Sequence, residues 1–431
     1  MDIGPKLTND NLVFGYDSGY TAEGVNLSSS RFYKGPPHTN LVEEIDYSNA
    51  NNTSANFFIN NSSEEVDIPK VGVRNVKYVE YYNNRYAADG SVNSGTTCCP
   101  NLFNYFVNSA PYIPVDSSSN YTYSIIYKHS HDYHSPNFMY HYQKDSSNNT
   151  LTEGGVSSTN SDRRTHLGDG WYHAWGNIAT QSTCTNVLLY SFLYNYGTVK
   201  HKYYVAAVSF VKNTTGETYM KIPPHLMLEP LASVSNTASL IDLKRTTDID
   251  LTNVSHSEFA QPEFDGTDDY FTTSGLSTSQ LVDLTFETVI RFSGSLDSND
   301  RKVFHWDKTS TTNGVAQIRK GDNNGRLMYQ HHNGTQWYTL AVDDVVVADT
   351  FAHITVVHNG TTATMYKNGV QIGTTSVGNL DYTNAGEILL GYRASSEYWK
   401  GNIPVFKVYE TALSASEIKQ NYNAYKNRFN I

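Results

Sequence analysis

The stretch that decides the fold is FAHITVVHNGTTATMYKNGVQIGTT, residues 351–375. It holds three short runs rich in β-branched and aromatic residues, and an Asn-Gly step, first Asn359-Gly360 and then Asn368-Gly369, follows each of the first two runs. Asn and Gly accept the positive φ angles that two-residue hairpin turns require. The stretch therefore predicts a meander of three antiparallel strands.

Patterns of the same kind surround this meander. Residues 284–292, LTFETVIRF, alternate so that Leu284, Phe286, Thr288, Ile290 and Phe292 share one face. Further strands are predicted at residues 302–306, 315–318, 326–330 and 337–340. Near the end of the chain, Ser414 or Ser416 is placed to cap a short amphipathic helix whose inward residues are Ile418, Tyr422 and Tyr425.

These strings together resemble the laminin-G/concanavalin-like family over residues 256–431. The matching positions are the Phe351-x-His353 entry, the Tyr366-x-Asn368-Gly369 hairpin, Leu390-Gly391, Gly401 and the closing Phe406-x-Val-Tyr409. The resemblance implies a β-sandwich that binds a ligand rather than transforming it. Retaining glycosidases of this architecture need two carboxylates about 5 Å apart, usually as Glu-x-Asp-x-x-Glu on one strand face. That string is absent and Glu287 has no acidic strand-mate, so we expect no enzymatic activity.

The rest of the chain predicts a second sandwich and an extended start. Residues 67–222 show short strands between turn signals, as in a jelly roll. Their landmark, LGDGWYHAWGNI at residues 167–178, resembles a step in jelly-roll carbohydrate-binding modules. Residues 1–66 are expected to form an attachment arm, and residues 223–255 a linker. The predicted fold class is all-β, with tandem sandwiches, an N-terminal arm and a short C-terminal helix.

Charge and composition exclude several function classes. The formal net charge is −11 and the basic residues form no run, so nucleic acid and anionic membranes are not expected partners. No apolar run approaches the roughly 20 residues of a spanning helix, and the first residues show no secretory signal. We therefore expect synthesis in a cytoplasm, with Cys98, Cys99 and Cys184 reduced and without zinc-site spacing.

Sugar recognition needs flat aromatic faces together with planar polar side chains. One predicted hairpin offers Arg326, Tyr329, Gln330, His331 and Trp337. A later connection offers Tyr392, Arg393, Tyr398 and Trp399, and one strand of the middle domain carries Tyr140 and Tyr142 on a single face. The alternative is that these aromatic residues fill the core or cover an edge, which holds most strongly for Trp337 and Trp399.

Two clusters hold potential metal ligands, although no cofactor is required by the sequence. His129, His131 and His134 lie close together and are of the type that zinc or copper accepts. Asp265, Asp268 and Asp269 offer the oxygens that calcium prefers, but without a complete Asp-x-Asp-x-Asp-Gly loop. Solvated histidines and turn-capping aspartates are the alternatives.

The two chain ends resemble those of structural proteins in tailed phages. The similar segments are LTNDNLVFGYDSGY at residues 7–20, RFYKGPPHTNLV at residues 31–42 and the closing helix. The resemblance implies a virion appendage such as a tail fibre, joined to other virion proteins through residues 1–66, forming a homotrimer and adhering to host surface polysaccharide. A capsid decoration or head-fibre protein is the alternative, and a polysaccharide depolymerase is a lesser one.

Overall fold

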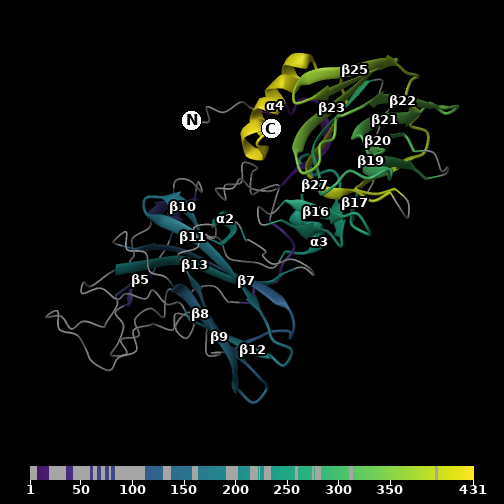
Figure 1. The fold of residues 1–431 in the computed structure, drawn as a ribbon. Coiled ribbons are helices and arrows are strands. Elements are labelled where there is room, and N and C mark those ends of the chain that lie inside the picture. Colours follow the sequence, from purple (N-terminus) through teal and green to yellow (C-terminus); the bar gives the residue numbers. More distant parts are fainter. Residues whose placement is uncertain are drawn as a thin grey trace, which may run out of the picture. The chain divides into compact units, whose positions relative to one another are not determined.

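The structure is a computed structural model in which the chain forms two compact units (Figure 1). The sandwich unit comprises residues 1–21, 26–37 and 235–431, and the inserted unit comprises residues 22–25 and 38–234. The residues that the structure describes are 7–18, 35–41, 59–61, 66–68, 73–76, 79–82, 112–129, 137–157, 164–190, 202–213, 222, 224–227, 234–257, 261–273, 276, 283–309, 314–393 and 397–431.

The sandwich unit consists of two antiparallel sheets. The first has the strand order β15-β16-β27-β18-β23-β24-β25, with β1 also paired to β27, and the second has the order β14-β17-β26-β19-β20-β21-β22. The first sheet is built from β1 (Leu12–Asp17), β15 (Ser255–His256), β16 (Pro262–Asp265), β18 (Asp283–Phe292), β23 (Phe351–Asn359), β24 (Thr362–Lys367), β25 (Val370–Ser376) and β27 (Lys400–Tyr409). The second is built from β14 (Ile249–Thr252), β17 (Tyr270–Thr273), β19 (Arg301–Lys308), β20 (Ala316–Gly321), β21 (Arg326–His332), β22 (Trp337–Val342) and β26 (Ala385–Leu390).

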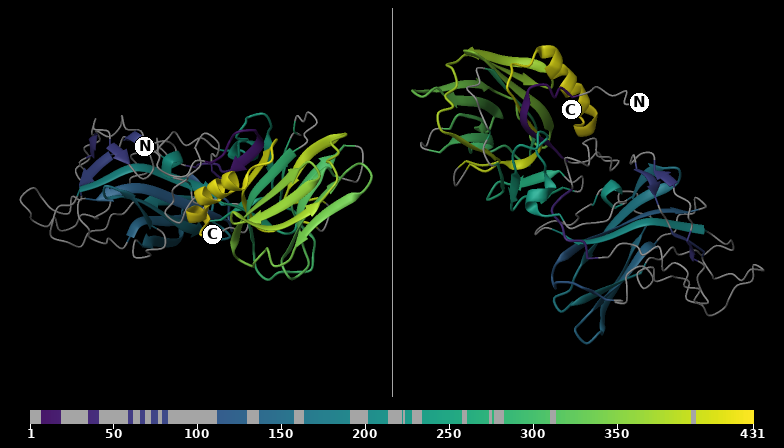
Figure 2. Two further views of the ribbon diagram at one scale, coloured as in Figure 1. Left: turned by 90° about the horizontal axis from the view of Figure 1, so that it is seen from above. Right: turned by 180° about the vertical axis from the view of Figure 1, so that it is seen from behind.

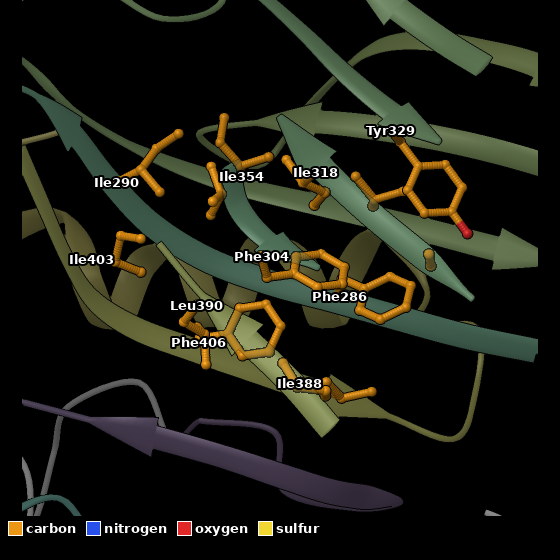
Figure 3. Close-up of a cluster of buried hydrophobic side chains, with 14 of the residues drawn as sticks. Phe286, Ile290, Phe304, Ile318, Tyr329, Ile354, Ile388, Leu390, Ile403 and Phe406 are labelled. Atoms are coloured by element: carbon orange, nitrogen blue, oxygen red, sulfur yellow. The ribbon is translucent and has the colours of Figure 1, made fainter. Parts of the chain in front are cut away.

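The core of this unit lies between the two sheets. Phe286 of β18 meets Phe304 of β19 with ring centroids 4.8 Å apart, and Phe304 meets Phe406 of β27 at 4.9 Å (Figure 3). Each such buried side chain contributes about 1.5–3 kcal/mol relative to exposure. The alternation predicted for residues 284–292 is confirmed for Leu284, Phe286, Ile290 and Phe292, which all belong to this core.

The predicted meander is present as β23, β24 and β25. In its second hairpin, Asn368 and Gly369 form the loop with φ of 53° and 73°, as the sequence predicts. The first hairpin differs by one residue. Asn359 still pairs with Thr362, so the loop is Gly360-Thr361, and Gly360 has a φ of 54°. One glycine at the first loop position is enough for a two-residue turn of the II′ kind.

The first strand of the chain completes the sandwich instead of belonging to an arm. β1 pairs with β27, with Tyr16 opposite Phe406, and both Phe14 and Tyr16 are fully buried. The two views of Figure 2 show β1 in purple within the sandwich unit, near the yellow helix α4 (Ala415–Phe429). The expectation of an attachment arm is therefore wrong for residues 7–18, because the strand signal was correct but its partner lies almost 400 residues away.

The later part of the predicted linker, from residue 235 onward, also belongs to the sandwich unit. Leu240, Ile249, Leu251 and Val254 are buried in the same core, and β14 pairs with β17. A short helix, α3 (Asn236–Ser239), precedes β14. A linker over residues 240–255 is thus excluded by burial of its apolar residues. In chain order, the inserted unit interrupts the sandwich between β1 and α3.

Helix α4 begins as predicted and covers the outer face of the first sheet. Ser414 is the N-cap, and it forms a reciprocal capping box with Glu417. Ile418 packs with Leu12, Val357 and Tyr409, whereas Tyr425 and Phe429 pack on Val289 and Val405. Tyr422 is only half-buried. The helix thus buries the face of β18, β23 and β27 that points away from the core.

The inserted unit is a second all-β sandwich. Its larger sheet has the order β10-β11-β7-β13-β5-β2, its smaller sheet the order β6-β12-β8-β9, and β3 pairs with β4. The bounds are β2 (Ile59–Asn61), β3 (Val66–Ile68), β4 (Val73–Val76), β5 (Val79–Tyr82), β6 (Ile113–Pro114), β7 (Asn120–His129), β8 (Asn137–Lys144), β9 (Thr150–Ser157), β10 (Arg164–Gly168), β11 (Trp171–Ala179), β12 (Asn186–Tyr190) and β13 (Lys202–Lys212), with one helical turn, α2 (Pro224–Met227).

The landmark predicted for this unit is the β10–β11 hairpin. Gly168, Asp169 and Gly170 all have positive φ and form its turn. Along β11, Ala174 and Ile178 enter one core cluster while Trp171 enters another, so both faces of the larger sheet are covered. Residues that alternate along this strand therefore lie on opposite faces of the sheet.

Candidate functional site

Three tyrosines from separate parts of the chain stack at one edge of the sandwich unit. Tyr270 begins β17, and Tyr392 and Tyr398 lie in the connection from β26 to β27. The rings of Tyr392 and Tyr398 are stacked with centroids 4.6 Å apart, and Tyr270 lies 5.2 Å from Tyr392. All three side chains are half-buried. We call this cluster the tyrosine stack.

Arg301 at the start of β19 holds the two segments that carry the stack. Its Nη1 donates to the carbonyl oxygens of Gly266 and Tyr398 at 3.0 and 2.9 Å. Its Nε and Nη2 donate to one oxygen of Asp297 at 3.2 and 2.6 Å. Because the guanidinium is planar and four of its five N–H groups donate in these bonds, it fixes both segments in one geometry. Arg301 thus holds the tyrosine stack in place before any ligand binds.

The loop before Tyr270 carries the three aspartates singled out from the sequence. Ligand oxygens of Asp265, Asp268 and Asp269 lie within 4.8 Å of one another. One oxygen of Asp265 accepts the backbone N–H groups of Thr267 and Asp268, and Asp269 accepts that of Asp265 at 2.7 Å. These bonds are turn capping, the alternative that the sequence left open. They assign no metal to the loop.

The environment of these carboxylates favours a proton on one of them. Burial, followed by the charges of Asp265 and Asp268, raises the pKa of Asp269 to about 7, although the N–H of Asp265 opposes this. Asp265 and Asp268 are exposed. Next to the stack, burial together with Tyr392, Tyr270 and Asp268 raises the pKa of Tyr398. The loop and the stack therefore share one electrostatic environment.

Three residues predicted to contact glycans are core residues instead. Tyr329, His331 and Trp399 are fully buried. Tyr329 bonds through its hydroxyl to Nδ1 of His358 at 3.1 Å, and Nε2 of His331 lies 2.8 Å from the carbonyl oxygen of Gly378. The prediction of surface contact is wrong for these residues, because their rings fill the interior of the sandwich.

The other hairpin residues stay near the surface but do not join the stack. Arg326 pairs with Asp343 at 2.6 Å, and Trp337 packs edge-on against His332. Gln330 accepts from Gln317 and Arg319 and donates to Thr339. β21 is separated from β17 in the sheet by β26, β19 and β20. The two segments proposed from the sequence are therefore two distinct surface areas.

In the inserted unit, the structure describes the side chains of only some of the predicted site residues. Tyr142 is half-buried, with the ammonium of Lys144 5.7 Å from its ring centroid. The side chains of Tyr140 and His129 lie outside the described residues, although their backbones belong to β8 and β7, and His131 and His134 lie outside them entirely. Nearby His141 is desolvated, which lowers its pKa to about 4.

Sequence reasoning missed Tyr270 and Arg301. Tyr270 directly follows the aspartates in FDGTDDYF, and this position next to a polar loop is the local feature that could have marked it as a site residue. Arg301 carries no motif, because its role depends on carbonyl groups of residues that are distant in sequence. Arg393 is half-buried beside Tyr392 and acts electrostatically on Lys302 and His305.

Glu287, the acid considered for catalysis, lies beneath α4 and away from the surface. It is fully buried and bonded to His353 and Tyr409, each at 2.8 Å. Burial by itself would raise the pKa of Glu287, but Lys407, His353 and Tyr409 outweigh burial and lower it to about 2. An ionised carboxylate enclosed in this way cannot protonate a glycosidic oxygen at the surface.

Comparison with solved structures finds partial similarity at low identity. A receptor-binding domain of botulinum neurotoxin mosaic serotype C/D is 14% identical, with a TM-score of 0.37, covering 43% of this chain and 48% of that one. The botulinum neurotoxin serotype D binding domain is 16% identical, with a TM-score of 0.36 and the same coverages. The chain thus spans about half the length of these structures.

Other comparisons concern the sequence and the helices. None of the curated proteins compared with the chain matches it. In the described residues, no helix has the length and apolarity needed to cross a membrane. Residues 265–419 match the profile of the Concanavalin A-like lectin/glucanases superfamily. The match begins at the aspartate loop and ends within α4, so it includes the tyrosine stack, and the sandwich unit is a lectin-like, concanavalin A-like β-sandwich.

Proposed function

We propose that this chain is an adhesive structural component of a phage virion, whose sandwich unit binds glycans of the host surface at the tyrosine stack. The observation that carries the adhesive part is the stack itself. Tyr270, Tyr392 and Tyr398 present part of their aromatic surface on a lectin-like sandwich. Buried tyrosines would serve the core alone, whereas these three are only partly buried.

The chemistry of the stack suits a pyranose ring. The C–H face of a sugar packs on an aromatic ring, and the hydroxyl groups around the ring need hydrogen-bond partners. The exposed carboxylates of Asp265 and Asp268 can accept such bonds next to Tyr270. Since Arg301 already fixes the loops, binding needs little reordering of the protein, which lowers its entropic cost.

The virion part of the proposal rests on the resemblance of the chain ends to phage structural proteins. We propose that attachment to other virion proteins uses N-terminal residues other than β1, because β1 is occupied by its pairing with β27. Assembly as a homotrimer would place several stacks on one appendage. Weak individual contacts then gain through effective concentration.

A glycan array probed with the full chain tests the adhesive function. We expect binding to at least one host-type surface glycan, and Tyr392→Ala and Tyr398→Ala should each reduce it at least about tenfold, as expected for loss of about 1.4 kcal/mol of stacking. Trp337→Ala, which changes a half-buried aromatic residue on β22, serves as the matched control. Loss of binding in Trp337→Ala alone would move the site to that hairpin. No binding to any glycan would overturn the adhesive function.

The position in a particle is tested separately. Electron microscopy of purified particles should show density for both sandwiches at an appendage, and mass spectrometry should find the chain among the particle proteins. A chain that is absent from purified particles would overturn the virion assignment. That outcome would leave glycan binding by the sandwich unit to be judged from the array.

A further inference from the structure

The tyrosine stack lies beside carboxylates that no cation of the described chain neutralises. Among the described residues, Asp265, Asp268 and Asp269 form no ion pair. Within the described ranges, the side chain of Asp268 accepts a hydrogen bond from a neutral partner alone, the amide of Asn253 at 3.1 Å, and its backbone N–H donates to Asp265. A ligand at the stack therefore meets uncompensated negative charge.

In the described part of the chain, the basic residues around the stack form no ion pair with the aspartates of the loop. Arg301 is bound to Asp297, and Lys302 lies 3.4 Å from Glu397. Lys400 is the cross-strand partner of Asp265, but its ammonium group lies 3.7 Å from the position that a Cβ on Gly294 would take. Arg393, directly after Tyr392 in the chain, carries a positive charge that lowers the pKa of Lys302 and His305 on β19. Arg301 reaches the aspartate loop through the carbonyl oxygen of Gly266 at 3.0 Å, but its ion pair is with Asp297 and not with a carboxylate of the loop.

We propose that the tyrosine stack selects uncharged glycans and rejects glycans that carry a carboxylate or sulfate, with Asp268 as the residue that discriminates. This inference rests on the proposed glycan binding. Asp268 is exposed, lies two residues before Tyr270 and acts electrostatically on Tyr398, so its charge is felt at both ends of the stack. Specificity here comes from repulsion of the wrong ligand, while the tyrosines supply the attraction.

The expected size of the effect follows from the exposure of the site. Two like charges several ångströms apart at a protein surface repel each other weakly in water and more strongly where the solvent is partly excluded. A discrimination of about tenfold against an acidic sugar is expected at low ionic strength, and salt should reduce it because exposed charges are screened. An attraction between the stack and the sugar ring would be unaffected by salt.

The test compares matched pairs of sugars that differ only in charge. The full chain is titrated with oligosaccharides of glucose, galactose or mannose and with the corresponding uronic acids. The wild type should bind a neutral member about tenfold more tightly than its acidic partner, and 0.5 M salt should narrow this gap by screening. Asp268→Asn should also narrow the difference in affinity, because it removes the repulsion of the acidic sugar and leaves the binding of the neutral sugar unchanged. Glu410→Gln, at an exposed carboxylate outside the loop, should leave the difference in affinity unchanged.

The outcomes separate the two proposals. Equal or tighter binding of the acidic members, or an Asp268→Asn chain with the same preference as the wild type, would overturn the charge selection while leaving glycan binding intact. A chain that binds no member of any pair, with Tyr392→Ala indistinguishable from the wild type, would overturn both. Thermal unfolding of Asp268→Asn at the wild-type temperature would show that the change acts at the site and not through the fold.

Discussion

Nε2 of His353 donates to Oε1 of Glu287 at 2.8 Å, and both side chains are completely buried between the outer face of the first sheet and α4. The second oxygen of Glu287 accepts from the Tyr409 hydroxyl and lies 3.7 Å from the ammonium of Lys407. Tyr409 also contacts the N-terminal segment, since its hydroxyl lies 3.0 Å from the carbonyl oxygen of Thr8. One carboxylate thus links β18, β23, β27 and the segment that precedes β1.

Glu287→Gln should destabilise the sandwich unit. It leaves Lys407 buried without a counter-charge, and breaking such a pair costs about 3–5 kcal/mol. The pKa of Glu287 is lowered from 4.5 to about 2, so the folded state favours the ionised form. This stabilisation, about 3 kcal/mol, is present above pH 4.5 and is lost as the pH falls toward 2. Between pH 4.5 and 2, the variant should therefore lose less free energy of unfolding than the wild type, as measured by denaturant unfolding.

Glu410→Gln is the control for that comparison, because Glu410 is an exposed carboxylate directly after β27. It should keep both the neutral-pH stability and the acid-induced loss of the wild type. If Glu287→Gln lost as much stability as the wild type between pH 4.5 and 2, the loss at acid pH would be caused by other buried groups.

A second prediction concerns the contact between the two chain ends. Arg428 near the end of α4 donates to the carboxylate of Asp17 and to the carbonyl oxygen of Ser18, and it is buried. Arg428→Met should lower the free energy of unfolding by about 3 kcal/mol, because Asp17 is left buried and unpaired. Hydrogen exchange should then rise selectively in β1. Arg326→Met, which breaks the exposed pair with Asp343, should cost under about 1 kcal/mol and leave β1 protected.

The sequence was sufficient wherever a feature is local. The Asn368-Gly369 turn, the Ser414 cap and the alternation in residues 284–292 depend on backbone preferences and periods that neighbouring residues determine. The turn and the alternation were predicted correctly, and Ser414 is one of the two caps that the sequence offered. The pairing of β1 with β27 depends on a partner that lies far along the chain, and the inserted unit hides this adjacency. No local pattern could have revealed it.

The candidate site could be predicted only in part for a related reason. Tyr329 and Tyr398 are both tyrosines next to polar residues, but one bonds His358 in the core and the other stacks at the surface. A tyrosine has an apolar ring and a polar end, so its side chain fits either place. Tyr392 and Tyr398 were identified from composition, while Tyr270 and Arg301 needed the folded arrangement.

The aspartate loop yields a third prediction. Asp269 has a pKa raised to about 7, so the folded state binds its proton more tightly than the unfolded state does. Stability should therefore fall as the pH rises from about 4 to 7. Asp269→Asn keeps an oxygen to accept from Asp265 but carries no charge, so it should stabilise the chain by about 1–2 kcal/mol at pH 8 and little at pH 4. Thermal unfolding at the two pH values measures this difference. Asp250→Asn, at an exposed position on β14, should leave the stability unchanged at both pH values, and a destabilised Asp269→Asn at pH 8 would contradict the argument.

The adjacent residues Tyr398 and Trp399 give the sharpest separation of function from folding. Trp399 is fully buried and meets Phe292 edge-on with ring centroids 5.6 Å apart, so Trp399→Ala should lower the free energy of unfolding by about 3–5 kcal/mol. Tyr398 is half-buried and stacks on Tyr392, so Tyr398→Ala should cost about 1 kcal/mol or less while removing most glycan binding. Denaturant unfolding and glycan titration of both variants measure the two effects. If Tyr398→Ala unfolded as readily as Trp399→Ala, the stack would be a structural element, and its loss of binding would follow from the fold.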